Sequence, residues 1–410
     1  MKYFLYTLTA FLISISAFGQ QPKDEMNDLI NNCLADINAD SIADYIISLE
    51  GFTTRFALAD NHRDVAVWIK NKFESFGCVA KLDSFQTTVQ WPFYSGNYHT
   101  TWQYNVEATI TGSESPEEYY VMGAHHDAIL YPDGDPMISS PGADDNASGV
   151  AAALEVARVL KLHNYQPTSS LRFVTFAMEE LGLYGSYDYA EKMAEDGVNI
   201  VAMLNNDMIS NSPANNWTVN LADYPNAIDL VNDALLLIDE YTTLNYTIDN
   251  SYMQYSDSWA FYQSDYPAVF FAESVFSPYY HTIDDVSGNI NPDYCAEVTK
   301  VCAAYLISKN GTVTGGVGIQ PIETNYLNLK CFPNPVNESA KLRFELQTPQ
   351  NVTISLYNTS GVLLQTVINE ERAAGNQVAF IATNNLPTGI YLAVIKAGNT
   401  SETIKINVIH

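Results

Sequence analysis

The chain of 410 residues is long enough for two or three domains with a large hydrophobic core. It carries 47 Asp and Glu residues against 19 Lys and Arg, which gives a formal net charge of -28. This acidic balance argues against nucleic acid or an anionic membrane surface as a partner, and it suits a site that holds cations.

Residues 1–19 have the pattern of a signal peptide. Lys2 precedes an uncharged apolar run, Phe4–Phe18, and the small residues Ala17 and Gly19 suit cleavage after position 19. The run is too short to span a membrane comfortably, and no later apolar stretch is long enough. We therefore expect an exported mature protein without a membrane span.

Helical and strand-like patterns share the next part of the chain, residues 20–310. Apolar residues at helical spacing predict helices over 26–49, 64–76, 147–162, 184–194, 227–241 and 292–309. Alternating or continuously apolar runs predict strands over 79–89, 105–111, 119–123, 171–177, 200–205 and 268–272. Because strands and helices alternate from residue 119 onward, we expect an α/β domain with a mixed, largely parallel central sheet flanked by helices.

The composition changes after residue 310. A Gly-rich stretch predicts a flexible linker over 311–324. The segment 325–410 has turn signals but no helical spacing, and strands are predicted over 341–346, 352–357, 362–368, 377–381, 391–396 and 403–408. Short strands at this density predict a small all-β sandwich domain.

Polar residues that can bind metal ions follow several predicted strands of the α/β domain. They are His125-His126-Asp127, Asp144-Asp145-Asn146, Glu179-Glu180, Asp207 and Tyr280-His281. The C-terminal ends of parallel strands share one edge of a sheet, so these groups can converge. Two histidines and three or four carboxylates suffice for two zinc ions with a shared carboxylate.

Five motifs at these positions, in this order, resemble the secreted two-zinc aminopeptidases, a family related to the glutaminyl cyclases. They read GAHHD (123–127), GADDNASG (142–149), FAMEELG (176–182), NDMI (206–209) and YHT (280–282). One such motif is a weak signal, but five in order are specific. The resemblance implies a zinc exopeptidase fold that spans most of residues 26–310.

The same resemblance implies a set of metal ligands. His125 and Asp207 would bind one zinc ion, and Glu180 and His281 would bind the other. Asp145 would bridge the two ions.

Three further residues take catalytic roles by this resemblance. Asp127 would orient the ring of His125. Glu179 would be the general base that takes a proton from the water between the metal ions and passes it to the departing amine. Tyr280 would donate a hydrogen bond to the tetrahedral oxyanion.

Simpler interpretations exist for some of these residues. A Glu-Glu pair is usually a solvated helix start, and the segment 144–146 can cap a helix. We expect His126 to be a structural or rim histidine. Asp284-Asp285 could support the loop of His281, but we expect the pair to form a solvated turn. The remaining histidines, which have no such neighbours, are interpreted as surface or locally bonded residues: His62, His99, His163 and His410.

Two other features are a departure from the family motif and the pairing of the cysteines. The chain has Ser256-Asp257-Ser258 where many relatives have Ser-Asp-His, a difference that we assign to the substrate subsites. Cys295 and Cys302 are separated by roughly 10 Å along one helix and cannot pair. A Cys33–Cys78 bridge stays open, with buried thiols as the alternative.

The C-terminal segment has its own resemblance. The motifs FPNP (332–335), VTISLYN (352–358), LPTGIY (386–391) and KINV (405–408) are similar to the C-terminal sorting domain of type IX secretion. This implies a secretion machinery as partner and export through the periplasm of a Gram-negative bacterium to the exterior or the cell surface. A generic adhesive or glycan-binding sandwich is the alternative.

Together these features predict a secreted dinuclear-zinc aminopeptidase that acts on peptides or proteins with a free N-terminus. Three alternatives use the same fold: a glutaminyl cyclase, a carboxypeptidase and a non-catalytic surface receptor.

Overall fold

The chain divides into two compact units, Met1–Gly316 and Val317–His410. The computed structural model describes residues 21–213, 217–310, 327, 329–332, 334–337, 339–346, 348–358, 362–398 and 400–409. The predicted signal peptide over 1–19 and linker over 311–324 lie outside the described residues. No helix in the described part of the chain is long and apolar enough to cross a membrane.

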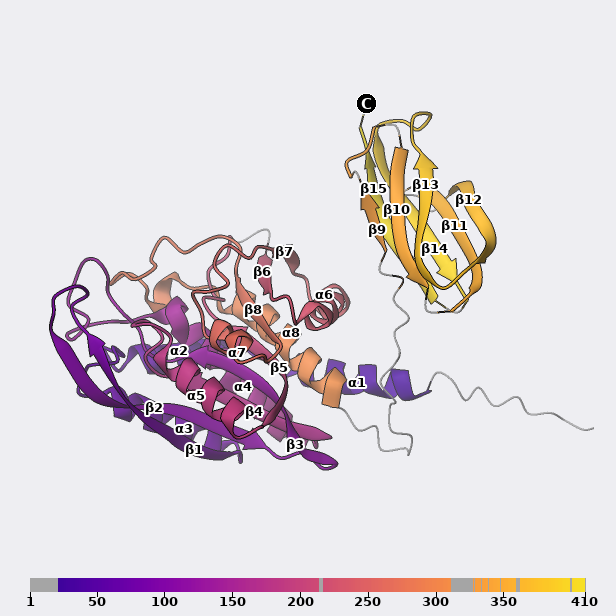
Figure 1. Cartoon of the computed structure of the whole chain (residues 1–410). Helices are drawn as coiled ribbons and strands as arrows, with labels where there is room; N and C mark the ends of the chain where they lie inside the picture. Colours follow the sequence, from indigo (N-terminus) through magenta and orange to yellow (C-terminus); the bar gives the residue numbers. More distant parts are fainter. Residues whose placement is uncertain are drawn as a thin grey trace, which may run out of the picture. The chain divides into compact units, whose positions relative to one another are not determined.

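An eight-stranded sheet forms the centre of the first unit (Figure 1). Its strands are β1 (Val79–Gln90), β2 (Tyr98–Ile110), β3 (Ser115–His125), β4 (Ser169–Phe176), β5 (Asn199–Asn206), β6 (Thr218–Asp223), β7 (Asn245–Ile248) and β8 (Ala268–Glu273). They lie in the order β1-β2-β4-β3-β5-β8-β6-β7. The central strands β4, β3, β5 and β8 are parallel to one another. On either side, β2 pairs antiparallel with β4 and β6 pairs antiparallel with β8. The predicted mixed, largely parallel sheet is confirmed.

Helices cover both faces of this sheet. They are α1 (Gln21–Ala35), α2 (Ala39–Glu50), α3 (His62–Ser75), α4 (Ser148–Leu162), α5 (Tyr184–Glu195), α6 (Ile228–Tyr241), α7 (Ser258–Gln263) and α8 (Pro292–Asn310). The crossovers from β3 to β4 and from β4 to β5 run in opposite directions along the sheet. Right-handed crossovers therefore place α4 and α5 on opposite faces. Helix α7 packs beside α5, and α2 and α8 pack against α4.

Some elements differ from the sequence-based prediction. The helical pattern over 26–49 is two helices, because the side chain of Asn38 accepts a hydrogen bond from the Ser41 amide (3.0 Å) and starts α2. Strands β6 and β7 and helix α7 were not predicted. Strand β7 is exposed along its whole length and α7 spans six residues, so neither has a clear hydrophobic period.

The second unit contains two antiparallel sheets around one apolar core. The strands are β9 (Lys330–Phe332), β10 (Ser339–Leu346), β11 (Gln350–Asn358), β12 (Leu363–Arg372), β13 (Gly375–Ala382), β14 (Gly389–Ala397) and β15 (Thr400–Val408). The sheet orders are β13-β10-β9 and β12-β11-β14-β15. Leu342 and Ile381 from the first sheet and Ile354 and Ile395 from the second share the core. The expected all-β sandwich is confirmed, with β9 as an unpredicted addition.

The five cysteines are free. The bridge left open between Cys33 and Cys78 is therefore not formed, and both thiols are buried. Burial raises the pKa of each of these thiols to about 11, which keeps them protonated and unreactive at neutral pH.

Gly149 lets α4 begin very close to the strands of the sheet. A Cβ atom added there would lie 2.2 Å from the Asn206 carbonyl oxygen and 2.6 Å from Asn146 Oδ1. Gly288, in contrast, has nothing within 4 Å of an added Cβ.

We expect Gly149→Ala to destabilise the protein by about 1–3 kcal/mol, because the added methyl group forces the helix away from the sheet. Thermal unfolding followed by circular dichroism measures the effect. Gly288→Ala is the control and should change the free energy of unfolding by no more than about 0.5 kcal/mol. Equal unfolding temperatures for the two variants would contradict the proposed close packing.

Candidate metal centre

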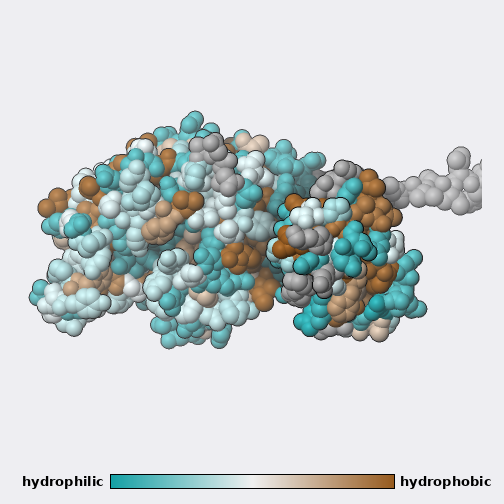
Figure 2. Space-filling view, turned by 90° about the horizontal axis from the view of Figure 1, so that it is seen from above, coloured by the Kyte–Doolittle hydropathy of each residue, from teal (hydrophilic) through white to brown (hydrophobic). Residues whose placement is uncertain are grey.

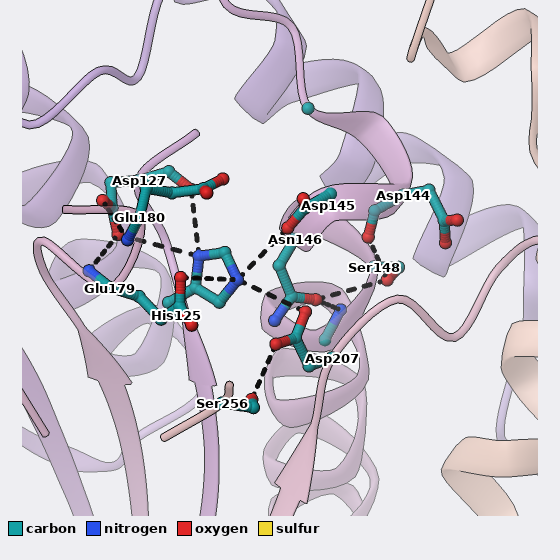
Figure 3. Close-up of polar contacts among 12 residues, drawn as sticks. His125, Asp127, Asp144, Asp145, Asn146, Ser148, Glu179, Glu180, Asp207 and Ser256 are labelled. Atoms are coloured by element: carbon teal, nitrogen blue, oxygen red, sulfur yellow. Dashed lines mark hydrogen bonds and ion pairs between the residues drawn. The ribbon is translucent and has the colours of Figure 1, made fainter. Parts of the chain in front are cut away.

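The predicted metal-binding residues lie at the C-terminal edge of the parallel strands, and Figure 3 labels all of them except His281. His125 is the last residue of β3, and Asp207 directly follows β5. Glu180 lies in the turn between β4 and α5, and Asp145 lies in the short segment that precedes α4. His281 is in the loop after β8. Parallel strands bring these positions together, as the sequence predicted.

The carboxylate of Asp145 lies between the two histidines. Its Oδ1 is 3.2 Å from His125 Nε2, and its Oδ2 is 3.3 Å from His281 Nε2. On the His125 side, Asp207 Oδ1 is 3.3 Å from the same Nε2 atom. On the His281 side, Glu180 Oε2 is 2.9 Å from Nε2. Asp145 thus joins two groups of ligand atoms.

These distances fit metal coordination. A tetrahedral zinc ion with ligands about 2.0–2.1 Å away separates neighbouring ligand atoms by about 3.3 Å. Within the described residues, one potential ligand atom from each of His125, Glu179 and Asp207 lies within 4.8 Å of the others, and the same holds for His125, Asp145 and Glu180.

Hydrogen bonds from a neutral His125 ring do not explain the arrangement. His125 Nδ1 lies 3.1 Å from the Asp127 carbonyl oxygen, which can only accept, so the ring carries its proton on Nδ1. In the neutral ring Nε2 then presents a lone pair to the oxygens of Asp145 and Asp207, a repulsive arrangement unless a cation lies between them. His281 Nε2 is buried and lies 2.9 Å from Glu180 Oε2 without the geometry of a hydrogen bond.

The charges of the site show the same need for a cation. Burial and the neighbouring Glu180 raise the pKa of Glu179 well above its usual value, and burial and Asp145 raise that of Glu180 to about 7. Burial would lower the pKa of His281, but Glu180 and Asp145 raise it to about 10. Buried acids at this density are stable only when protonated or paired with positive charge.

Asp127 connects the two halves of the site. Its carboxylate oxygens accept hydrogen bonds from the backbone amides of Glu179 (3.0 Å) and Glu180 (3.3 Å). Oδ1 is 3.6 Å from His125 Nδ1, farther than the Asp127 carbonyl oxygen. The main contact of this carboxylate is therefore with the turn that carries the two glutamates.

This turn is not the helix start that a Glu-Glu pair often forms. The carbonyl oxygen of Glu179 accepts hydrogen bonds from the amides of Gly182 and Leu183 (both 2.8 Å), and α5 begins only at Tyr184. Successive side chains in the turn point in different directions, which lets Glu180 face His281 while Glu179 faces His125 at 4.0 Å.

Non-glycine residues with positive φ angles flank the site. They are Met178 (φ 64), Met208 (φ 54) and His281 (φ 58). Met178 precedes Glu179, Met208 follows Asp207, and His281 is itself a candidate ligand. Such backbone conformations cost about 1 kcal/mol or more each and occur mainly where function requires them.

Neighbouring polar residues hold the segment before α4. Asn146 Oδ1 accepts a hydrogen bond from the Gly149 amide (2.9 Å) and caps the first turn of the helix. Asp144 does not cap it, because its Oδ1 accepts from the amide (2.8 Å) and the hydroxyl (3.0 Å) of Ser210. Asp145 is left free to point into the site.

Two sequence-based interpretations are wrong. Asp285 is not in a solvated turn: it is 3% exposed and accepts hydrogen bonds from the amides of Asp144 (2.8 Å) and Asp145 (3.0 Å). Ser256 does not belong only to a substrate subsite, because its buried hydroxyl donates to Asp207 Oδ2 (2.6 Å). Neither contact was visible in the sequence, since each joins residues far apart in the chain.

Two other residues lie near the site. His126 is buried, with Nδ1 3.1 Å from Thr175 Oγ1, and burial lowers its pKa to about 4. The ring of Tyr280 stacks on that of His281 with centroids 3.7 Å apart. Burial and the carboxylates around it raise the pKa of Tyr280, so its hydroxyl stays protonated and able to donate.

The histidines outside the site have local partners where they are described. His62 Nε2 lies 2.9 Å from the Trp102 carbonyl oxygen, and His99 Nε2 lies 3.0 Å from that of Trp91. His163 Nε2 lies 2.7 Å from Asp36 Oδ2. His410 lies outside the described residues.

Comparison with known proteins gives two matching families. Residues 105–306 match peptidase family M28. Residues 330–409 match the secretion system C-terminal sorting domain. The two matched segments fall in the α/β unit and the all-β unit.

Individual relatives extend the comparison. A probable zinc metalloprotease of Pyrenophora tritici-repentis is 33% identical over 236 residues, 54% of this chain and 51% of the relative, so the chain spans about half of its length. The crystal structure of the LapA aminopeptidase of Legionella pneumophila is similar with a TM-score of 0.58 and 25% identity, over 70% of this chain and 76% of that one. A Fimbriiglobus ruber glutaminyl cyclase (TM-score 0.56, 15% identity, over 66% and 95%) shares the fold alone.

The raised pKa values of buried carboxyl groups near the metal centre determine how the folding stability of the metal-free protein depends on pH. Burial raises the pKa of Glu180 and Asp257 to about 7 and that of Asp285 to about 8, from ordinary values near 4. Between pH 4 and pH 8 the folded state therefore binds more protons than the unfolded state, and stability must fall as pH rises through this range.

We expect the unfolding temperature of the protein in a chelator to decrease from pH 5 to pH 8, as measured by differential scanning calorimetry. Zinc should reduce this decrease, because positive charge offsets the ionised carboxylates. An unfolding temperature that rises with pH in the chelator would contradict the assignment of these raised pKa values.

Proposed function

We propose that the chain, whose residues 105–306 match peptidase family M28, is a secreted aminopeptidase that holds two zinc ions and removes N-terminal residues from peptides. The observation that carries this proposal is the position of Asp145, whose two oxygens face different histidines at 3.2 and 3.3 Å. A carboxylate in this position suits two metal ions better than one.

The ligands divide between two positions. His125 and Asp207 would hold one zinc ion, Glu180 and His281 would hold the other, and Asp145 would serve both. The distances of 2.9–3.3 Å from the histidine nitrogens to the carboxylate oxygens support this division. Zinc bound here supplies Lewis-acid chemistry, which polarises a peptide carbonyl and lowers the pKa of water.

The protein side chains move and hold protons in this proposal. Glu179 is buried and is not one of the five ligands, so its carboxylate can take a proton from the attacking water and deliver it to the departing amine. The protonated hydroxyl of Tyr280 donates a hydrogen bond to the oxyanion that forms from the carbonyl.

The charge of the site favours an aminopeptidase over a carboxypeptidase. Glu179 and Asp207 lie beside the metal positions and attract a free α-ammonium group. The same carboxylates repel the C-terminal carboxylate that a carboxypeptidase must bind. A glutaminyl cyclase remains the second candidate, because that fold is shared. A non-catalytic receptor is disfavoured, since all five ligand positions and the glutamate base are present.

We expect the zinc-loaded protein to hydrolyse free aminoacyl anilides and to leave N-acetylated ones intact, because acetylation removes the positive charge of the amine. Absorbance of the released aniline measures hydrolysis, and elemental analysis should find two zinc ions per chain. A chelator should abolish the activity. Equal cleavage of the acetylated substrate, or cyclisation of N-terminal glutamine without hydrolysis, would refute an aminopeptidase.

Glu179→Gln is the matched variant for this test. It preserves the size of the side chain and removes the base, so activity should fall by about 10²–10⁴-fold with both zinc ions retained. Full activity in a variant that keeps both ions would remove Glu179 from this role.

The C-terminal unit suggests how the enzyme leaves the cell. We assign residues 1–19 to a signal peptide, 20–310 to the peptidase, 311–324 to a linker and 325–410 to a domain that the secretion machinery recognises. The match to a secretion system C-terminal sorting domain supports the last assignment. The unit has its own apolar core, so the peptidase does not need it to complete its fold.

Deletion of residues 325–410 should therefore leave an active enzyme that stays in the periplasm. Cell fractionation with the anilide assay measures where the activity resides. Activity in the medium at the level of the full chain would contradict the sorting role.

A further inference from the structure

Arg55 is a buried cation whose side-chain donors reach backbone carbonyls. It is 2% exposed. Its Nε donates to the His126 carbonyl oxygen (3.0 Å), Nη2 donates to that of Gly142 (2.6 Å), and Nη1 donates to that of Pro141. Removing the charge of an arginine from water is costly unless the buried guanidinium makes hydrogen bonds or ion pairs that compensate for the lost hydration.

The three carbonyl groups belong to two segments that carry metal ligands. His126 lies between His125 and Asp127, at the end of β3. Pro141 and Gly142 begin the segment that leads to Asp145. The planar guanidinium thus ties the end of the strand to the segment that carries the bridging carboxylate.

Asp285 binds the backbone amides of the same segment. Its Oδ1 accepts from the Asp144 amide (2.8 Å), its Oδ2 accepts from the Asp145 amide (3.0 Å), and its own carbonyl oxygen accepts from the Ala143 amide (2.9 Å). Asp285 follows His281 by four positions, so it links the loop of that ligand to the bridging residue.

The segment 141–145 is therefore held by the guanidinium of Arg55 on its carbonyl groups and by the carboxyl and carbonyl oxygens of Asp285 on its amides. There is no room for it to shift toward the arginine. A Cβ atom at Gly142, where φ is +54, would lie 2.3 Å from the Asp145 carbonyl oxygen, 2.5 Å from Ala128 Cβ and 2.8 Å from Arg55 Nη2.

We propose that Arg55 and Asp285 are positioning residues that hold Asp145 midway between His125 and His281 and thereby set the affinity of the centre for zinc. This inference rests on the proposed function, because it requires the metal ligands assigned there. Neither residue touches the substrate. They act by fixing the backbone on both sides of one carboxylate, so that its two oxygens are already directed at different metal positions.

The test compares zinc affinity with the stability of the metal-free protein. Arg55→Lys keeps the positive charge but loses the planar set of donors, and Asp285→Asn keeps the shape but can accept only through one oxygen. We expect each variant to raise the zinc dissociation constant by about 10–100-fold, measured by competition with a chromophoric chelator. The unfolding temperature in excess chelator should fall no more than in the control variants.

Two controls match these variants. Arg172→Lys alters a mostly buried arginine, 11% exposed, that pairs with Glu107 away from the metal centre. Asp284→Asn alters the exposed neighbour of Asp285. Both controls should bind zinc as the unaltered chain does.

A double variant tests whether the two residues act on one segment. If they do, Arg55→Lys combined with Asp285→Asn weakens zinc binding by less than the product of the two single effects. Independent, multiplicative effects would overturn the shared action. Zinc affinity equal to that of the controls in both single variants would overturn the proposal entirely. If Arg55→Lys does not fold, the zinc affinity of Asp285→Asn alone tests the proposal. This isosteric change replaces one of the two acceptor oxygens with an amide donor and leaves the other in place.

The outcomes also separate this inference from the proposed function. If the unaltered chain binds two zinc ions and hydrolyses no peptide, the enzyme assignment fails while the positioning role stands or falls on the variants. If the unaltered chain binds no zinc, both are wrong.

Discussion

The structure depends on one electrostatic constraint: five carboxylates and two imidazoles are buried together at the edge of a sheet. Burial raises the pKa of Glu180 to about 7. The neighbouring carboxylates raise the pKa of His281 to about 10, so without added charge the imidazole is protonated at neutral pH and Glu180 is partly protonated. Asp145 is the centre of this cluster, since it is the residue that contacts both histidines. Divalent cations relieve the constraint, and the rest of the site is arranged to receive them.

The fold supplies this arrangement at some cost to its own stability. Parallel strands end at a common edge, where their polar residues converge. The residues beside the ligands, such as Met178 and Met208, adopt positive φ angles that a free chain avoids. Asp127 holds the turn of the two glutamates, and Ser256 holds Asp207. Rigid support of this kind is what a centre with preorganised ligands requires.

The same centre explains why the fold alone does not identify the reaction. A zinc aminopeptidase and a glutaminyl cyclase share this sheet, so their difference must lie in how a few side chains hold metal and substrate. Under the proposed function, the position of Asp145 between the two histidines suits two ions, and the carboxylates of Glu179 and Asp207 suit a substrate with a free amine. The all-β unit matches a secretion system C-terminal sorting domain and contributes none of the candidate metal ligands.

The sequence by itself determined most of the strands and helices, the division into an α/β part and an all-β part, and a set of residues that could bind a metal. These follow from local patterns: hydrophobic period, turn residues, and polar groups placed after strands. It could not reveal the role of Arg55 or Asp285, because an isolated arginine and an Asp-Asp pair carry no local signal. Only the tertiary structure brought them onto one segment 141–145, through contacts between residues that are distant in the chain.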